Sequence, residues 1–288
     1  MDQKIKILRG EDIPKRLLEI PKPPKAISIR GALPEESMIY LTVIGSRKYT
    51  RYGKEVIEKL ISSLRGRNVV IVSGLALGID SLAHEEAIKN GLKTIAFPGS
   101  GLDPKFIYPR TNFSLAEKIV SSGGALVSEF ALDQRATRWT FPQRNRLMAG
   151  ISDAILIIEA EAKSGSLITT TLGLDYNKNI LTVPGPIFSE TSIGTNNLLK
   201  QGATPITNAK DLLEALGLAK EKDTEEEIDL EDLTDEERTL LENLKEPRDK
   251  DELIRLSGMP ASKAQIVITS MELKGLIKEE LGEIRRNF

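Results

Sequence analysis

The chain has 288 residues, 40% of them hydrophobic, and a formal net charge of -2, which suits one substantial globular domain and a smaller one. It contains no cysteine and a single histidine, which argues against disulfides, thiolate metal sites and the usual histidine-based zinc sites or hydrolase triads. No apolar run reaches the ~18 residues of a membrane span and no secretion signal is recognisable, so we expect a cytoplasmic protein with no metal or other cofactor.

The charges are unevenly distributed along the chain. Residues 222–288 carry 11 Lys and Arg against 19 Asp and Glu, whereas residues 1–221 carry 29 against 23. The larger part of the chain is therefore basic although the whole is slightly acidic. A basic part is compatible with a polyanionic partner.

Residues 1–37 are interpreted as a lead-in, and a regular alternation of apolar and helical segments follows them. The apolar runs are rich in Val and Ile and do not alternate with polar residues, as in strands that are buried on both faces. This pattern predicts a mostly parallel α/β sheet, doubly wound and Rossmann-like, over residues 38–217. The predicted strands are 40–45, 69–74, 93–99, 125–130, 153–160 and 179–185.

Two further segments complete the predicted organisation. Residues 218–233 are highly charged and predict an acidic linker. Three short amphipathic segments and a hairpin-like ending over 234–288 predict a small winged-helix domain. Its third helix offers only Lys263 and Lys274 as cations in an acidic region, which argues against sequence-specific binding of duplex DNA and favours a protein-contact or regulatory role.

The candidate binding site lies at the carboxyl ends of the predicted strands, where the loops are rich in glycine and serine. GSR at 45–47 follows the first strand, SGLALGID at 73–80 the second, and AKSGSLITT at 162–170 the fifth. Small residues let a ligand approach the backbone, and the free N–H groups of helix starts attract anions. The usual GxGxxG and GxxxxGK[ST] signatures are absent, which disfavours a dehydrogenase or a Walker-type ATPase. The loops therefore predict a groove for phosphates of another ligand.

A helix is predicted over residues 142–149, with proline in its first turn. Arg144 and Arg146 are then about 200° apart around the helix axis and cannot face one pocket. We expect one of them to reach a phosphate and the other to brace the fold against an acid at a strand end, Glu129 or Glu159.

Arg138 and Phe141, at the start of this helix, can project together into the groove. An arginine neutralises phosphates, and an aromatic ring stacks on an unpaired base for roughly 1–3 kcal/mol, so the pair predicts binding of single-stranded nucleic acid. Trp139, the only tryptophan, is expected to pack within the fold instead of stacking on a ligand.

Distinctive motifs occur in a fixed order along the chain: GSR at 45–47, SGLALGIDSLAH at 73–84, PGSGLD at 98–103, SEF at 128–130 and FPQRNRLMAG at 141–150. In this order they resemble the DprA/Smf family of DNA-processing proteins, over about residues 20 to 210. The resemblance implies an extended Rossmann domain that forms homodimers and binds single-stranded DNA in a positive pocket. It also implies delivery of the RecA recombinase to DNA, and protection of that DNA, during natural transformation.

The resemblance further implies roles for individual residues. Arg47 corresponds to a phosphate contact, Arg138 to the basic residue before the motif phenylalanine, and Phe141 to a base-stacking partner. Leu77 stands where many members have arginine, so one positive charge is missing here. The predicted DNA-binding residues are Gly45, Ser46, Arg47, Ser73, Gly74, Arg138, Phe141, Arg144, Asn145, Arg146, Ser164, Gly165 and Ser166.

One enzymatic alternative stays open, a nucleotide phosphoribohydrolase on a related Rossmann core. Those enzymes usually carry a PGGxGT loop with a catalytic glutamate nearby, whereas this chain has PGSGLD and PGPIF. We therefore expect a DNA-binding mediator that is not an enzyme. A transcription regulator acting through residues 234–288 is disfavoured by the acidity of that segment.

Overall fold

The computed structural model describes residues 4–219, 233–280 and 282–286, which belong to two separate units divided at residue 220. Most of the acidic linker predicted at 218–233 lies outside the described residues. In the described part of the chain, no helix combines the length and apolar character needed to cross a bilayer.

Within the described residues of the first unit, nine strands form one sheet in the order β1-β2-β6-β5-β4-β3-β7-β8-β9. The neighbouring pairs from β6 to β9 are parallel, whereas β2 runs antiparallel to both β1 and β6. The prediction of a mostly parallel α/β sheet is confirmed. The strands are β1 (Lys6–Arg9), β2 (Ala26–Gly31), β3 (Ile39–Ile44), β4 (Val69–Ser73), β5 (Lys93–Ala96), β6 (Ala125–Ser128), β7 (Ala154–Ile157), β8 (Asn179–Thr182) and β9 (Thr204–Pro205).

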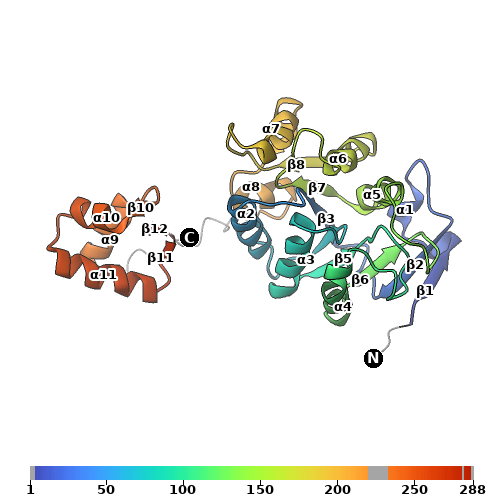
Figure 1. The fold of residues 1–288 in the computed structure, drawn as a ribbon, viewed down its shortest axis with the longest axis horizontal. Helices are drawn as coiled ribbons and strands as arrows, with labels where there is room; N and C mark the ends of the chain where they lie inside the picture. The colour runs from blue at the N-terminus through green and yellow to red at the C-terminus, as the bar shows by residue number, and fades with distance from the viewer. Residues whose placement is uncertain (1–3, 220–232, 281, 287–288) are drawn as a thin grey trace. The chain divides into compact units, whose positions relative to one another are not determined.

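Helices cover both faces of this sheet (Figure 1). Successive residues of β7 alternate between two apolar layers: Ile155 and Ile157 lie in the layer that includes α1 and α5, whereas Leu156 lies in the layer of α2 and α3. Both faces of the strand are therefore apolar, which is why the predicted strands lacked polar alternation. The helices are α1 (Lys15–Leu18), α2 (Arg51–Ser62), α3 (Ile79–Lys89), α4 (Phe113–Ser121), α5 (Thr140–Ile151), α6 (Ser166–Asp175), α7 (Ile193–Lys200) and α8 (Ala209–Ala215), with short 3-10 turns at Gly10–Asp12, Arg110–Asn112 and Glu190–Ser192.

The interpretation of residues 1–37 as a lead-in outside the main domain is wrong. Strands β1 and β2 lie in this segment and extend the sheet beyond β6, with Ile29 opposite Val127. The side chain of Ile29 is buried in the same apolar layer as α1 and α5. Because β2 pairs with a strand far along the chain, its local sequence carried little signal of the pairing.

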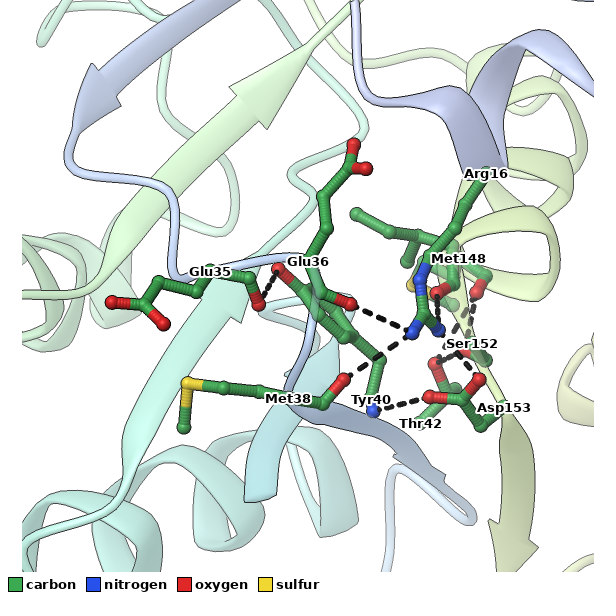
Figure 2. Close-up of polar contacts among 10 residues, drawn as sticks. Arg16, Glu35, Glu36, Met38, Tyr40, Thr42, Met148, Ser152 and Asp153 are labelled. Atoms are coloured by element: carbon green, nitrogen blue, oxygen red, sulfur yellow. Dashed lines mark hydrogen bonds and ion pairs between the residues drawn. The ribbon is translucent and has the colours of Figure 1, made fainter. Parts of the chain in front are cut away.

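A polar network fixes this N-terminal segment to the amino end of β3 (Figure 2). The Arg16 guanidinium lies 2.6 Å from the Asp153 carboxylate and donates to the backbone carbonyls of Glu36 and Met38. The other carboxylate oxygen of Asp153 accepts the backbone N–H of Tyr40 at 2.8 Å, and the Tyr40 ring centre lies 4.8 Å from the same guanidinium. Burial raises the pKa of the Tyr40 hydroxyl to about 12, so this ring stays neutral. Arg16 and Asp153 thus join α1 to the segments that precede β3 and β7.

The second unit has its own small apolar core, which includes Leu240, Ile268 and Ile284. Three helices and a three-stranded sheet in the order β10-β12-β11 confirm the winged-helix prediction. Both cations of its third helix region are paired within the unit, Lys263 with Glu236 and Lys274 with Glu237, each at 2.7 Å. The elements are α9 (Asp235–Asn243), β10 (Arg248–Asp249), α10 (Lys250–Leu256), α11 (Ala261–Leu273), β11 (Ile277–Glu280) and β12 (Glu283–Arg286).

Candidate functional site

The topology of the first unit creates a crevice between β3 and β7. From β3 the chain continues through β4, β5 and β6 on one side, whereas β7, β8 and β9 build the other side. The loops after β3 and β7 therefore diverge at the carboxyl ends of these strands, where ligands of doubly wound sheets bind. A cavity of about 620 Å³ lies there, walled by both loops and by the starts of α5 and α6.

Most of the predicted DNA-binding residues line this one cavity. They are Gly45, Ser46, Arg47, Arg138, Phe141, Arg144, Asn145, Ser164, Gly165 and Ser166. Ser73, Gly74 and Arg146 are not among its lining residues, and contacts within the protein explain each of these three exceptions.

Ser73 is the last residue of β4, and Gly74 follows it. The Ser73 hydroxyl is fully buried and donates to the carbonyl of Val43 at 2.7 Å. The Gly74 N–H donates to the Asp80 carboxylate at 3.0 Å, and a Cβ at position 74 would come within 2.5 Å of the Arg144 guanidinium. Gly74 therefore makes room for a pair of charged side chains, and it does not present its backbone to a ligand.

Arg144 lies at the floor of the cavity, with only 5% of the residue exposed. Its guanidinium donates to the carbonyl oxygens of Gly74 and Phe97, and its Nε donates to the Asn145 side chain at 3.0 Å. Burial lowers the pKa of Arg144 to about 10, although the nearby Asp80 opposes the shift. Burial likewise raises the pKa of Asp80, and Arg144 is the largest influence against it. The arginine is still charged at neutral pH, and most of its donors serve the protein.

Arg146 braces the outer side of α5. It forms an ion pair with Glu129 and donates to the carbonyl of Lys22 at 2.5 Å. The expectation that an acid at a strand end pairs with one of the two α5 arginines is confirmed for Glu129. It is wrong for Glu159, whose carboxylate accepts the backbone N–H and the hydroxyl of Thr50. Arg146 is therefore not available to a ligand in the cavity.

Arg47 and Arg138 differ from the two α5 arginines because their side chains are exposed. Neither guanidinium has a hydrogen-bond or ion-pair partner in the described part of the chain. Each instead lies near an aromatic ring, Arg47 at 5.5 Å from the centre of Phe141 and Arg138 at 4.5 Å from the centre of Trp139. Because both line the same cavity, two solvated cations are available to phosphates there.

The loop after β3 presents Arg47 through a tightly packed turn. A Cβ on Gly45 would come within 2.7 Å of Ile79, so the glycine permits close approach of α3. The Ser46 hydroxyl donates to the carbonyl of Lys48 at 2.8 Å and accepts the N–H of the same residue. Lys48 also lines the cavity. It was not among the predicted residues, although its position next to Arg47 is a signal that could have identified it.

The start of α6 forms the opposite wall. The helix begins at Ser166, and the hydroxyls of Ser164 and Ser166 are 2.7 Å apart. A Cβ on Gly165 would meet nothing within 4 Å, so its backbone borders open space. This arrangement agrees with the predicted small-residue loop in front of a helix start, which favours an anion.

Phe141 provides an aromatic wall. Its ring packs directly on Gly99, where a Cβ would lie 2.6 Å from two ring carbons, and the Tyr108 ring centre lies 6.0 Å away. Helix α5 begins at Thr140, two residues before the predicted start, because Thr140 and Thr137 exchange side-chain and backbone hydrogen bonds. Phe141 therefore stands in the first turn of the helix, where its orientation is fixed.

Several lining residues were not predicted, among them Asp80, Glu161, Ile168 and Thr169. The Asp80 carboxylate accepts the backbone N–H of Gly74 at the floor of the cavity, and so tethers the loop after β4. The others follow β7 in the segment whose glycine and serine residues predicted the anion site. No local pattern separates their cavity-facing side chains from solvent-facing ones.

A family model described as DNA recombination-mediator protein A matches residues 4–217, and one described as DprA winged helix domain matches residues 224–283. Protein Smf of Escherichia coli (strain K12) is 39% identical over 207 residues, which cover 72% of this chain and 55% of that protein. The chain thus spans little more than half the length of this relative.

The solved structures that are similar to the chain include two DNA-processing proteins. DprA from Streptococcus pneumoniae has a TM-score of 0.68 and 34% identity, with 74% of this chain and 75% of that chain covered. DNA processing protein A from Helicobacter pylori has a TM-score of 0.67 and 32% identity, with 75% and 98% covered, and its structure concerns the single-stranded DNA binding mode of that protein. By its sequence, its sheet and its C-terminal unit, this chain belongs to the DprA/Smf family of DNA-processing proteins, whose main domain is that of DNA recombination-mediator protein A.

Proposed function

We propose that this chain binds single-stranded DNA in the cavity between the loops after β3 and β7. The main support is that Arg47 and Arg138, two exposed guanidinium groups without acceptors among the described residues, line the same cavity as the ring of Phe141. The similarity to the Helicobacter pylori protein, whose structure concerns single-stranded DNA, supports the same ligand.

The geometry favours a single strand over a duplex. Phosphates bind to the two arginines, and a base stacks on the Phe141 ring that Gly99 holds in place. Stacking on a side chain requires a base whose face is not covered by its neighbours, which a duplex offers only after unstacking. In the second unit, Lys263 of α11 and Lys274, which follows this helix, are paired with glutamates, so the unit is poorly suited to binding duplex DNA. We therefore assign it a protein-contact role.

The bound strand is then handed to a RecA-type recombinase, and the chain acts as a homodimeric, non-enzymatic mediator that protects DNA during natural transformation. Family membership supports this part of the proposal. We expect the chain to shorten the lag of DNA-stimulated ATP hydrolysis by a recombinase on a strand precoated with single-strand-binding protein. An unchanged lag would contradict the delivery step and leave DNA binding intact.

Binding is tested by fluorescence polarisation of labelled oligo-dT and of a duplex of equal length, at several salt concentrations. We expect tighter binding of oligo-dT, and weaker binding by the Arg47→Ala and Arg138→Ala variants. Each lost phosphate contact should also reduce the slope of log K against log salt by about 0.7. Arg65→Ala is a matched control, because Arg65 is exposed and follows α2 at the amino edge of the sheet. Unchanged affinity in both cavity variants would reject the site.

The enzymatic alternative predicts release of free base from nucleoside monophosphates. The buried carboxylate of Asp80 accepts the N–H groups of Gly74 and Ala76 and is therefore engaged in holding the loop after β4. We expect no free base after incubation, measured by chromatography. Release that disappears in an Asp80→Asn or Glu161→Gln variant would restore the enzymatic alternative.

A further inference from the structure

Trp139 is exposed, contrary to the expectation that it packs within the fold. Its relative exposure is 67%, although tryptophan has the largest side chain and usually contributes to a core or an interface. It stands immediately before α5, and its backbone N–H bonds the Thr137 hydroxyl at 3.3 Å. The position of the backbone is therefore defined, while the indole lies in solvent.

Arg138 connects this indole to the cavity. The arginine lines the cavity, and its guanidinium carbon lies 4.5 Å from the centre of the Trp139 ring. Trp139 itself is not a lining residue, so the indole lies just outside the cavity, next to its rim. A guanidinium at this distance covers part of one indole face through a cation–π contact and restricts the ring.

The surroundings of the indole suit a polyanion better than an apolar protein partner. The segment 131–139 carries Arg135 and Arg138 against a single acid, Asp133, and all three side chains are exposed. Arg135 lies 6.0 Å from the ring centre of Phe106, and neither arginine has an ion-pair partner in the part of the chain that the structure describes. Solvated cations next to an exposed aromatic ring are the combination used to bind single strands.

We propose that Trp139 is a second stacking platform, which receives a base adjacent to the nucleotide bound at Phe141. The strand leaves the cavity past Arg138, whose guanidinium contacts a phosphate between the two bases. This inference rests on the proposed function and adds a contact outside the cavity. It also assigns Arg138 a second task, because the guanidinium holds the indole in place for the base.

Trp139 is the only tryptophan of the chain, so the intrinsic tryptophan fluorescence reports on this contact. Titration of the intact protein with unlabelled oligo-dT should quench the tryptophan emission, with the same midpoint as the polarisation titration. As a control, Ile7→Trp in a Trp139→Phe background places the only tryptophan on the exposed edge strand β1, and its emission should not change.

Two substitutions of Trp139 separate stacking from bulk. Trp139→Leu keeps an apolar side chain without a flat face and should weaken oligo-dT binding about fivefold to tenfold, at the lower end of a stacking contact. Trp139→Phe keeps a ring and should retain most of the affinity.

Quenching together with weaker binding by Trp139→Leu supports the platform. Unchanged emission, or a Trp139→Leu variant that binds as tightly as the native chain, overturns it while polarisation still shows DNA binding through Arg47 and Phe141. Absence of oligo-dT binding by the native chain in the polarisation assay instead overturns the proposed function itself.

Discussion

The two arginines of α5 and the two at the rim of the cavity serve opposite purposes. Within α5, Arg144 and Arg146 donate to backbone carbonyls and to a carboxylate of the protein itself. At the rim, Arg47 and Arg138 are exposed, and their guanidinium groups lie near aromatic rings without a hydrogen-bond or ion-pair partner among the described residues. A buried guanidinium must find acceptors when the protein folds, whereas an exposed one exchanges water for phosphate when the ligand binds. Surroundings, and not residue type, separate the structural cations from the binding ones.

The largest expected effect is on stability, and it comes from replacing Arg144, the buried arginine of α5. Arg144→Met leaves the carbonyls of Gly74 and Phe97 without a donor and Asp80 without its neighbouring cation, so it should lower the free energy of unfolding by about 3–5 kcal/mol. Urea unfolding at pH 7 measures this loss. Arg138→Met is the matched control and should stay within about 0.5 kcal/mol of the native chain. Equal losses of unfolding free energy in the two variants would contradict the distinction between the α5 arginines and the rim arginines.

The next effect tests the aromatic wall at the rim. Phe141→Leu should weaken oligo-dT binding by about fivefold to 150-fold, the range of one stacked base. Gly99→Ala should weaken it as well, because the new methyl group would occupy the space of the Phe141 ring. Polarisation titrations measure both, with circular dichroism as the check on folding. Native affinity in a folded Gly99→Ala variant would show that the ring position does not matter.

A buried histidine of α3, His84, should also produce a pH dependence. This residue is fully buried in α3, its Nδ1 bonds the Thr94 hydroxyl at 2.7 Å, and burial, aided by the charge of Arg144, lowers its pKa from 6.5 to about 3. The folded state therefore keeps His84 neutral where the unfolded state binds a proton. The contribution of neutral His84 to the free energy of unfolding is complete above the unfolded pKa of 6.5 and is lost as the pH falls toward 3. About 2 kcal/mol of this contribution is lost near pH 5.

Urea unfolding at pH 7 and pH 5 measures this loss, and a His84→Leu variant serves as the reference for the titration of all other groups. The native chain should lose more unfolding free energy than the variant over this interval. Identical losses would show that His84 is not kept neutral by the fold.

The smallest expected effect on binding comes from a substitution that adds a cation at the rim of the cavity. Leu77 is exposed next to Ala76, which lines the cavity. Leu77→Arg should strengthen oligo-dT binding less than about fivefold, as for a single exposed charge, and steepen the salt slope by about 0.7. Leu77→Gln controls for the loss of the leucine. A steeper slope in both variants would contradict the electrostatic explanation.

Much of the fold could be predicted because its central strands are apolar on both faces. The runs that contain β3, β4 and β7 are long enough to be recognised without a partner. Strands β1 and β9 were missed because they are short and lie at the edges of the sheet, whereas β2 is as long as β3 but pairs with β6, far along the chain. Their pairing depends on distant segments, which local patterns do not reveal.

The candidate site was predictable in its location but less so in its details. Arg47, Arg138 and Phe141 could be predicted to project into one groove, and the structure brings all three to one cavity. Arg144 could not be separated from them, because its burial depends on Gly74 and Phe97, which come from other parts of the chain. Trp139 was misjudged because tryptophan usually packs inside, whereas here it is exposed and its ring centre lies 4.5 Å from the Arg138 guanidinium.

The pairing of β2 with β6 sets the order in which the chain can fold during synthesis. Residues 6–31 are synthesised well before β6, which pairs with β2, and before the Asp153 carboxylate that receives Arg16. Until then β2 exposes an unpaired apolar edge, which is a point for chaperone binding or for misassociation between nascent chains. Strand β2 thus meets its neighbour β1 early and its neighbour β6 late.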